Sequence, residues 1–176
     1  MAAETTDEVL RAPLVIEYPF RRTTGPVIGA FFTAVREGRL LGIKAADGSV
    51  ICPPQEYDPV SSEPLTELVP VGDTGEVVTW TWVNEAREGQ PFDRPFAWAL
   101  VRLDGADTPM LHALDVASPD DVSVGQRVRV VWAEERTGLI TDFHFAPDTE
   151  NSAAAASDRQ ATTQRPGPPR RCPNAG

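Results

Sequence analysis

Apolar and polar residues alternate along the second half of the chain, beginning near residue 76. In the stretch EVVTWTWVN, Val78, Trp80 and Trp82 fall on one face of an extended strand. The other face has Val77, Thr79, Thr81 and Val83. Four further strands are indicated by PFAWALVRLD, PMLHALDVA, QRVRVVWAEE and GLITDFHFAP, with turn residues between them. The stretch LTELVPVG, residues 65–72, is either a sixth short strand or the first half of a long bent one.

Five short strands with almost no helix between them predict a mainly β fold that closes as a small barrel. A sandwich of two sheets is the rival architecture, but about 80 residues is short for two full sheets. We therefore predict a five-stranded OB-fold barrel over residues 65–147.

A helix is predicted ahead of the barrel in GPVIGAFFTAVREGRL, residues 25–40. Pro26 suits the first helical turn, and Gly38 is placed to end the helix. Its apolar stripe has to dock on another surface, because three helical turns are marginal alone. That surface is either the chain's own domain or a partner protein. The candidate partner interface consists of Ile28, Phe31, Phe32, Val35 and Tyr57.

The two ends of the chain have the composition of disordered segments. Residues 148–176 are built from Ala, Ser, Thr, Gln, Pro and Arg without apolar periodicity, and we expect a disordered tail there. Residues 1–13 are expected to be flexible. The organisation predicted from the sequence is thus a flexible N-terminus (1–13), a helix with a turn-rich segment (14–64), the barrel (65–147) and the tail (148–176).

The charge of the chain limits the functions that it can have. The formal net charge is −10, which disfavours nucleic-acid binding, and the one small basic cluster, Arg165, Arg170 and Arg171, lies in the tail. No run of eighteen apolar residues could span a membrane, and the acidic N-terminus lacks the order of a secretory signal. Cys52 and Cys172 are expected to stay unpaired, so we expect a cytoplasmic protein.

The side chains that could carry chemistry do not form a catalytic set. The two histidines, His112 and His144, each lie in a predicted strand, and Asp115 faces the opposite side of the strand from His112. The chain is therefore not expected to be an enzyme on its own. The aromatic side chains are either core or the wall of a ligand channel: Trp80, Trp82, Phe96 and Trp98, with His112 beside them.

The segment GIKAADGSVICPPQEYDPVSSEP, residues 42–64, has the turns of a metal knuckle but a single thiol, Cys52. A structural zinc needs four Cys or His ligands, commonly in two close pairs. The ligand count therefore predicts no zinc and no other cofactor.

The chain resembles the family of acyl-CoA-associated OB-fold proteins, known as domain-of-unknown-function family 35, over residues 26–147. The resemblance rests on REGRLLG in a helix ending REGRLLGIK, PP…YDP, GEVVTWTWV, PFAWALVRLDGADTPMLHALD and VGQRVRVVW. Members of the family look like a helix and a rubredoxin-like zinc ribbon fused to an OB barrel. Their ribbon has two C-x-x-C pairs, which would fall near Ala45 and Asp47 and at Asp58 and Ser61. The chain is similar to an actinobacterial branch that has lost the metal.

The resemblance implies a function as a subunit of an enzyme complex. Family members pair with thiolase-like proteins of the lipid-transfer type, and some pair with MaoC-like hydratases. We expect a non-catalytic accessory subunit of an aldolase or thiolase that acts on steroid side-chain or other bulky acyl-CoA thioesters, with acyl-CoA as the potential ligand. The alternatives are a single-stranded nucleic-acid-binding protein, a stand-alone acyl-CoA-binding protein, and an independent acyl-CoA hydrolase or hydratase.

Overall fold

A computed structural model of the chain describes residues 23–149. The predicted flexible N-terminus lies outside the described residues, as does the predicted tail apart from its first two residues. The elements are α1 (Gly25–Arg36), β1 (Leu40–Lys44), β2 (Val50–Ile51), β3 (Leu68–Val71), β4 (Thr74–Val83), β5 (Phe96–Leu103), β6 (Met110–Leu114), η1 (Pro119–Asp121), β7 (Arg127–Trp132), η2 (Ile140–Asp142) and β8 (Phe143–Pro147).

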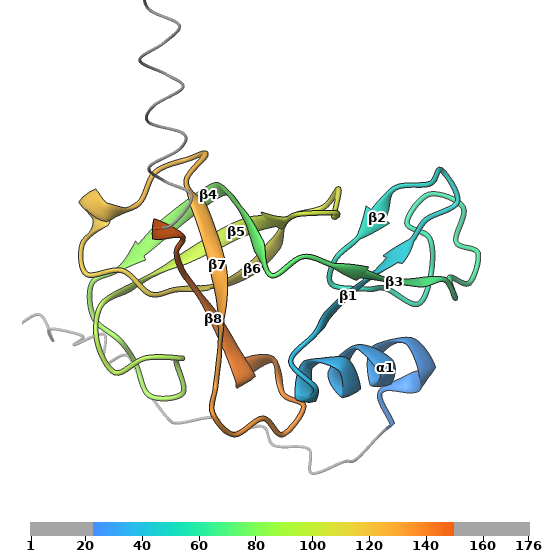
Figure 1. The fold of residues 1–176 in the computed structure, drawn as a ribbon, viewed down its shortest axis with the longest axis horizontal. Coiled ribbons are helices and arrows are strands. Elements are labelled where there is room, and N and C mark those ends of the chain that lie inside the picture. The colour runs from blue at the N-terminus through green and yellow to red at the C-terminus, as the bar shows by residue number, and fades with distance from the viewer. Residues whose placement is uncertain (1–22, 150–176) are drawn as a thin grey trace, which may run out of the picture.

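Five strands form a closed barrel in the order β4-β5-β6-β8-β7. All neighbouring strands in the barrel are antiparallel except β6 and β8, which pair in parallel. Figure 1 shows this barrel beside a smaller sheet that α1 accompanies. The predicted mainly β fold, an OB-fold barrel preceded by a helix, is confirmed.

The barrel interior is filled by alternating large and small side chains. Trp80 of β4 lies opposite Ala99 of β5, and Trp82 lies opposite Ala97. Both alanines are fully buried, and both tryptophans pack against the core while staying partly exposed. The small residues on β5 therefore make room for the indoles on β4.

A β-bulge in β4 changes the faces that the sequence pattern predicted. Pairing with β5 shifts register between Val77 and Thr79, so one extra residue sits in β4. Val77, which we placed opposite the tryptophans, is fully buried and belongs to the same core as Trp80 and Trp82. The prediction was wrong here because a strict period of two cannot show an inserted residue.

A second sheet, in the order β2-β1-β3, lies next to the barrel. β3 belongs to this small sheet and not to the barrel. The first strand of the barrel is therefore β4, which begins at Thr74 rather than at residue 65. β1 was missed, because LLGIK was read as the end of the helix. The helix instead ends at Arg36, and Gly38 has a φ of 75°, the left-handed conformation that glycine adopts at the end of a helix.

The helix α1 packs on both the small sheet and the barrel. Its buried residues are Val27, Phe31, Ala34 and Val35. Val27 joins a small core with Ile43, and Phe31 and Val35 join the barrel core. The chain thus forms two adjoining cores that one helix connects.

Within residues 23–149, no helix is long and apolar enough to cross a lipid bilayer.

Candidate functional site

Two turns of the knuckle-like segment are joined by the carboxylate of Asp58. Its Oδ2 accepts a hydrogen bond from the backbone N–H of Ala46 at 3.0 Å, and Ala46 lies twelve residues earlier in the chain. Its Oδ1 accepts from Val60 N–H at 2.8 Å and from Ser61 N–H at 2.9 Å. The side chain is buried. One carboxylate therefore holds the turn at residues 45–48 against the turn at residues 58–63.

The hydrogen bonds from these backbone groups favour the charged form of Asp58. The N–H groups of Ser61, Ala46 and Val60 together lower its pKa to about 2. The carboxylate is therefore ionised at neutral pH, and both of its oxygens are engaged by the protein backbone.

The residues at the predicted metal positions do not fit a zinc ion. Ala45 offers no ligand atom, and Asp47 accepts hydrogen bonds from the backbone and hydroxyl of Ser49. Asp58 already bonds to backbone N–H groups. Among the described residues, no group of three or more His, Cys, Asp or Glu side chains lies where it could hold a metal. Whether the chain works without zinc stays a prediction.

The turn between β5 and β6 fastens the small sheet to the barrel. The N–H of Val50 donates to Oδ2 of Asp107 at 2.8 Å, and the N–H of Asp107 donates to the carbonyl of Val50 at 2.8 Å. The N–H of Cys52 donates to the hydroxyl of Thr108 at 2.8 Å, and that hydroxyl donates to the Cys52 carbonyl at 3.2 Å. Val50 of β2 and Cys52, which follows the strand, are thus held by four hydrogen bonds from one turn.

The one thiol of this segment is inert. Cys52 is 1% exposed, and burial raises the pKa of its thiol to about 12. Its role is packing, because it belongs to the barrel core.

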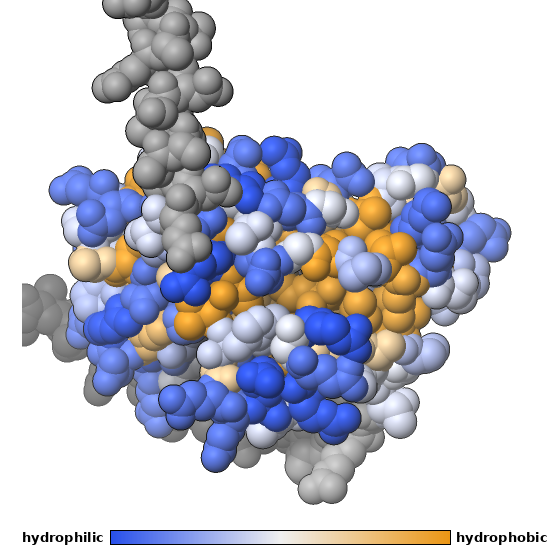
Figure 2. All heavy atoms as spheres, in the orientation of Figure 1, coloured by the Kyte–Doolittle hydropathy of each residue, from blue (hydrophilic) through white to orange (hydrophobic). Residues whose placement is uncertain are grey.

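An apolar face of the small sheet points away from α1. Val69 lies opposite Gly42, and a Cβ on Gly42 would come within 2.6 Å of Val50 Cγ1 and 3.2 Å of Val71 Cγ1. Because side chains alternate along a strand, this set lies on the face opposite Ile43, which packs with α1. All three valines are partly exposed, and Val71 also packs against the barrel core. The exposed Lys44, which pairs with Val50, lies at the edge of the same face. Figure 2 shows apolar surface that extends from the barrel across this sheet.

The five residues of the candidate partner interface are not all at the surface. Phe31 and Val35 are 2% and 0% exposed, so these two are core residues and offer no contact surface. Ile28 and Phe32 are partly exposed, and Tyr57 is 58% exposed. The buried face of α1 shares Phe31 and Val35 with the predicted stripe and also includes Val27 and Ala34. A partner contact at Ile28, Phe32 and Tyr57 stays a prediction.

Of the five candidate channel residues, two are buried in the core and three are partly exposed. Phe96 is fully buried and His112 is 4% exposed, so both are core residues. Trp80 is partly buried against the barrel core. Trp82 and Trp98 line a pocket of about 580 Å³ at the loop between β4 and β5.

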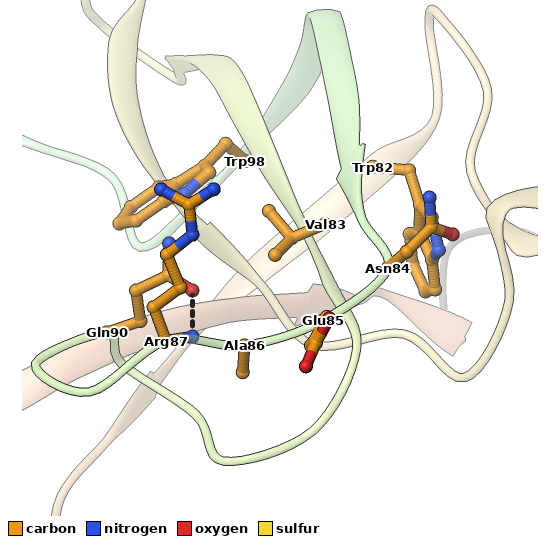
Figure 3. Close-up of a pocket in the computed structure, with 8 residues that line it drawn as sticks. All are labelled: Trp82, Val83, Asn84, Glu85, Ala86, Arg87, Gln90 and Trp98. Carbon is orange, nitrogen blue, oxygen red and sulfur yellow. Dashed lines mark hydrogen bonds between the residues drawn. The ribbon is translucent and has the colours of Figure 1, made fainter. Parts of the chain in front are cut away.

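This pocket is formed mostly by the loop itself. Figure 3 shows Trp98, Val83 and Arg87 around the hollow, with Gln90 beside Arg87. The side-chain oxygen of Gln90 accepts a hydrogen bond from the Arg87 N–H at 2.9 Å and so shapes the loop. Loops at this end of an OB barrel carry ligand sites in many proteins. Contact of Trp82 and Trp98 with a ligand stays a prediction.

An ion pair that the sequence did not reveal fixes the same loop. Arg94 donates to both oxygens of Asp115, at 2.7 and 2.9 Å, and lowers the pKa of that carboxyl group. Phe92 packs edge-on against Phe96 at 5.5 Å and against His144 at 5.3 Å. Arg94 and Asp115 lie 21 residues apart, so only the pairing of β5 with β6 brings them together.

His112 is an unusual polar residue in the barrel core. Its ring lies 4.3 Å from that of Phe143, and its Nε2 is buried without a hydrogen-bond partner. Burial lowers its pKa to about 4. His112 is therefore neutral at pH 7, and the described residues give its Nε2 no hydrogen-bond partner that it could activate as a base.

The fold and the knuckle-like segment define the class of protein. The chain is an OB-fold protein in which a helix and a small sheet precede the barrel, with knuckle turns that a carboxylate joins. A family model described as "ChsH2, C-terminal OB-fold domain" matches residues 68–133. A DUF35 domain-containing scaffold protein from Pyrococcus furiosus is 28% identical over 114 residues, which cover 62% of this chain and 83% of that protein.

Two solved structures share the fold. An "Ltp2-ChsH2(DUF35) aldolase" chain matches with a TM-score of 0.54 at 22% identity, over 72% of this chain and 98% of its own. A DUF35 protein of unknown function from Sulfolobus solfataricus matches with a TM-score of 0.55 at 20% identity, over 71% of this chain and 87% of its own. The chain is thus similar in sequence to a DUF35 protein and to the ChsH2 OB-fold domain, and it shares the fold of two DUF35 structures.

The role of Asp58 can be tested by removing its negative charge. We expect Asp58→Asn to lower the thermal unfolding midpoint by several degrees, because an amide is a weaker acceptor and turns one donor toward a backbone N–H. Asp47→Asn, in the neighbouring exposed turn, serves as the matched control and should change the midpoint little. Equal midpoints for the two variants would show that the Asp58 contacts do not stabilise the fold.

The buried His112 should make the folded state sensitive to mild acid. Its pKa is about 4 in the folded chain against an ordinary 6.5, so between these values only the unfolded state binds the proton and stability falls as the pH decreases. Between pH 7 and pH 5 this histidine should account for a loss of about 2 kcal/mol. Urea unfolding at both pH values should show that loss shrinking in His112→Leu and persisting in His144→Gln. If His112→Leu keeps the full pH dependence, His112 is not its source.

Proposed function

We propose that this chain is a non-catalytic accessory subunit of a thiolase-like aldolase. The observation that carries the proposal is the apolar face formed by Val50, Val69 and Val71 around Gly42. The fold leaves this face partly exposed, although the opposite face of the same sheet is covered by α1. Partly exposed apolar surface that continues over two elements is typical of a protein interface. The names of two relatives, a scaffold protein and an aldolase complex, support a partner of this class.

The chemistry of the reaction would belong to the partner. His112 is buried and neutral, Cys52 is a buried thiol, and Asp58 bonds to backbone N–H groups. None of them is positioned to attack or deprotonate a substrate. This subunit would instead hold the partner in its active arrangement and border its substrate channel.

The substrate class that we propose is a bulky acyl-CoA thioester, such as one with a steroid side chain, handled by a cytoplasmic complex. The pocket beside Trp98 supports this proposal, because it combines an indole, an aliphatic side chain and a guanidinium group at the rim of the barrel. The family resemblance also suggests a MaoC-like hydratase as a second partner. The co-purification experiment can include that protein.

Co-purification tests the proposed partnership. We expect the chain to elute with a thiolase-like protein of the lipid-transfer type from the same genome when the two are expressed together. Val69→Lys places a charge on the apolar face and should weaken the complex at least about tenfold, or about 1.4 kcal/mol. Val124→Lys is the matched control, since Val124 is 68% exposed in the loop before β7 and should bind as the unchanged chain does.

Two results would contradict the proposal. The first is separate elution of this chain from every thiolase-like and MaoC-like protein tested, with aldolase activity unchanged by its presence. The second is an equal affinity of Val69→Lys and Val124→Lys for the partner, which would place the interface elsewhere.

A further inference from the structure

A second apolar pocket lies on the other side of the small sheet, where α1 begins. It has a volume of about 320 Å³ and lies between the first turn of the helix and the segment that leads to β3. Most of its lining is apolar: Pro26, Val27, Tyr57, Pro64, Leu65 and Leu68. Val27 and Leu65 belong to the small core with Ile43, so the pocket opens directly onto that core.

The walls of this pocket are fixed by backbone hydrogen bonds. Leu65 N–H donates to the carbonyl of Glu56 at 2.9 Å, and Tyr57 pairs with Pro64 as an isolated antiparallel bridge. Asp58, the next residue, is held in place by three backbone N–H groups. The pocket therefore exists before anything binds, and Tyr57 stays 58% exposed at its edge.

The small core beneath the pocket is thin. It has five buried members, Val27, Ile43, Ala45, Ile51 and Leu65, and Leu68 is only partly buried against it. An apolar segment laid over Tyr57 and Leu68 would remove further apolar surface from water. The arrangement has the form of a core with one side left open.

We propose that residues 13–20 of the same chain, PLVIEYPF, pack into this pocket. The described residues begin at Thr23, three positions before Pro26 in the pocket lining. PLVIEYPF lies directly ahead of that point and contains five large apolar or aromatic side chains, Leu14, Val15, Ile16, Tyr18 and Phe20. A segment tethered so closely has an effective concentration in the millimolar range, so even modest contacts keep it bound.

Charge supports the same occupant. Arg21 and Arg22 stand between PLVIEYPF and the start of α1. The carboxylate of Glu56 lines the pocket and lies against Gly25, and Glu63 and Glu67 are in the same segment of chain. The two arginines would therefore enter an acidic surrounding as the apolar residues ahead of them fill the pocket.

Hydrogen exchange of the full chain tests this inference with variants that keep its length. The test variant carries Leu14→Ser, Ile16→Ser and Phe20→Ser. The matched control carries Val9→Ser and Leu10→Ser in the same terminus. We expect two amides to exchange about tenfold faster in the test variant than in the control: that of Leu65, which donates within the pocket wall, and that of Ser62, which donates in the adjoining turn. Amides in the barrel, such as that of Val101, should exchange at the same rate in both.

Each other outcome overturns the inference. Equal exchange at residues 56–68 in the two variants would mean that PLVIEYPF does not cover the pocket. Faster exchange of the barrel as well would mean that the segment stabilises the whole fold by contacts elsewhere. In a second measurement, a peptide of residues 13–22 added to a chain that lacks residues 1–20 should restore the slow exchange, and a peptide with the same three serines should not.

Discussion

The carboxylate of Asp58 is the contact on which the arrangement of the N-terminal half depends. It joins two turns that are twelve residues apart, and the chain between these turns includes β2 and Cys52. With both turns held, β2 meets the β5–β6 turn, where Asp107 accepts the N–H of Val50 and Thr108 accepts that of Cys52. The small sheet is thereby fixed against the barrel, with one face under α1 and the other partly exposed.

A carboxylate can do this because the groups to be joined are backbone N–H donors. A zinc ion joins two turns through four side-chain ligands, whereas Asp58 accepts from three main-chain groups that any sequence supplies. The cost of burying the charge is offset by those hydrogen bonds, which is also why the pKa of this group is so low. A carboxylate can thus join the two turns in a segment that has a single thiol, Cys52.

The regular parts of the fold could be predicted from the sequence, and the long-range contacts could not. Strict alternation around Trp80 and Trp82 revealed the barrel strands, because a half-buried strand has a period of two. β1 escaped, since it is five residues long, contains Gly42 and follows the helix within a few residues. The bulge in β4 escaped because an inserted residue leaves the composition of the strand unchanged.

The candidate site shows the same division. Counting Cys and His residues was enough to predict that zinc ligands are missing. The sequence could not predict that Asp58 joins the two turns, because its partners are backbone N–H groups, which have no sequence signature. The pairing of Arg94 with Asp115 depends on the register of β5 and β6. Phe31 and Val35 lie on the apolar stripe of α1, yet only the structure shows that the barrel already covers them.

The proposed accessory role is compatible with this arrangement. The Asp58 carboxylate is used by the backbone of its own segment, and the three valines of the small sheet stay partly exposed.

We propose that the carboxylate of Asp58 holds the knuckle turns together without a metal ion. Metal analysis of the purified chain, combined with thermal unfolding with and without a strong chelator, tests it most directly. We expect far less than one zinc per chain and the same unfolding midpoint in both solutions. One zinc per chain, removed by the chelator together with a fall in the midpoint, would contradict it.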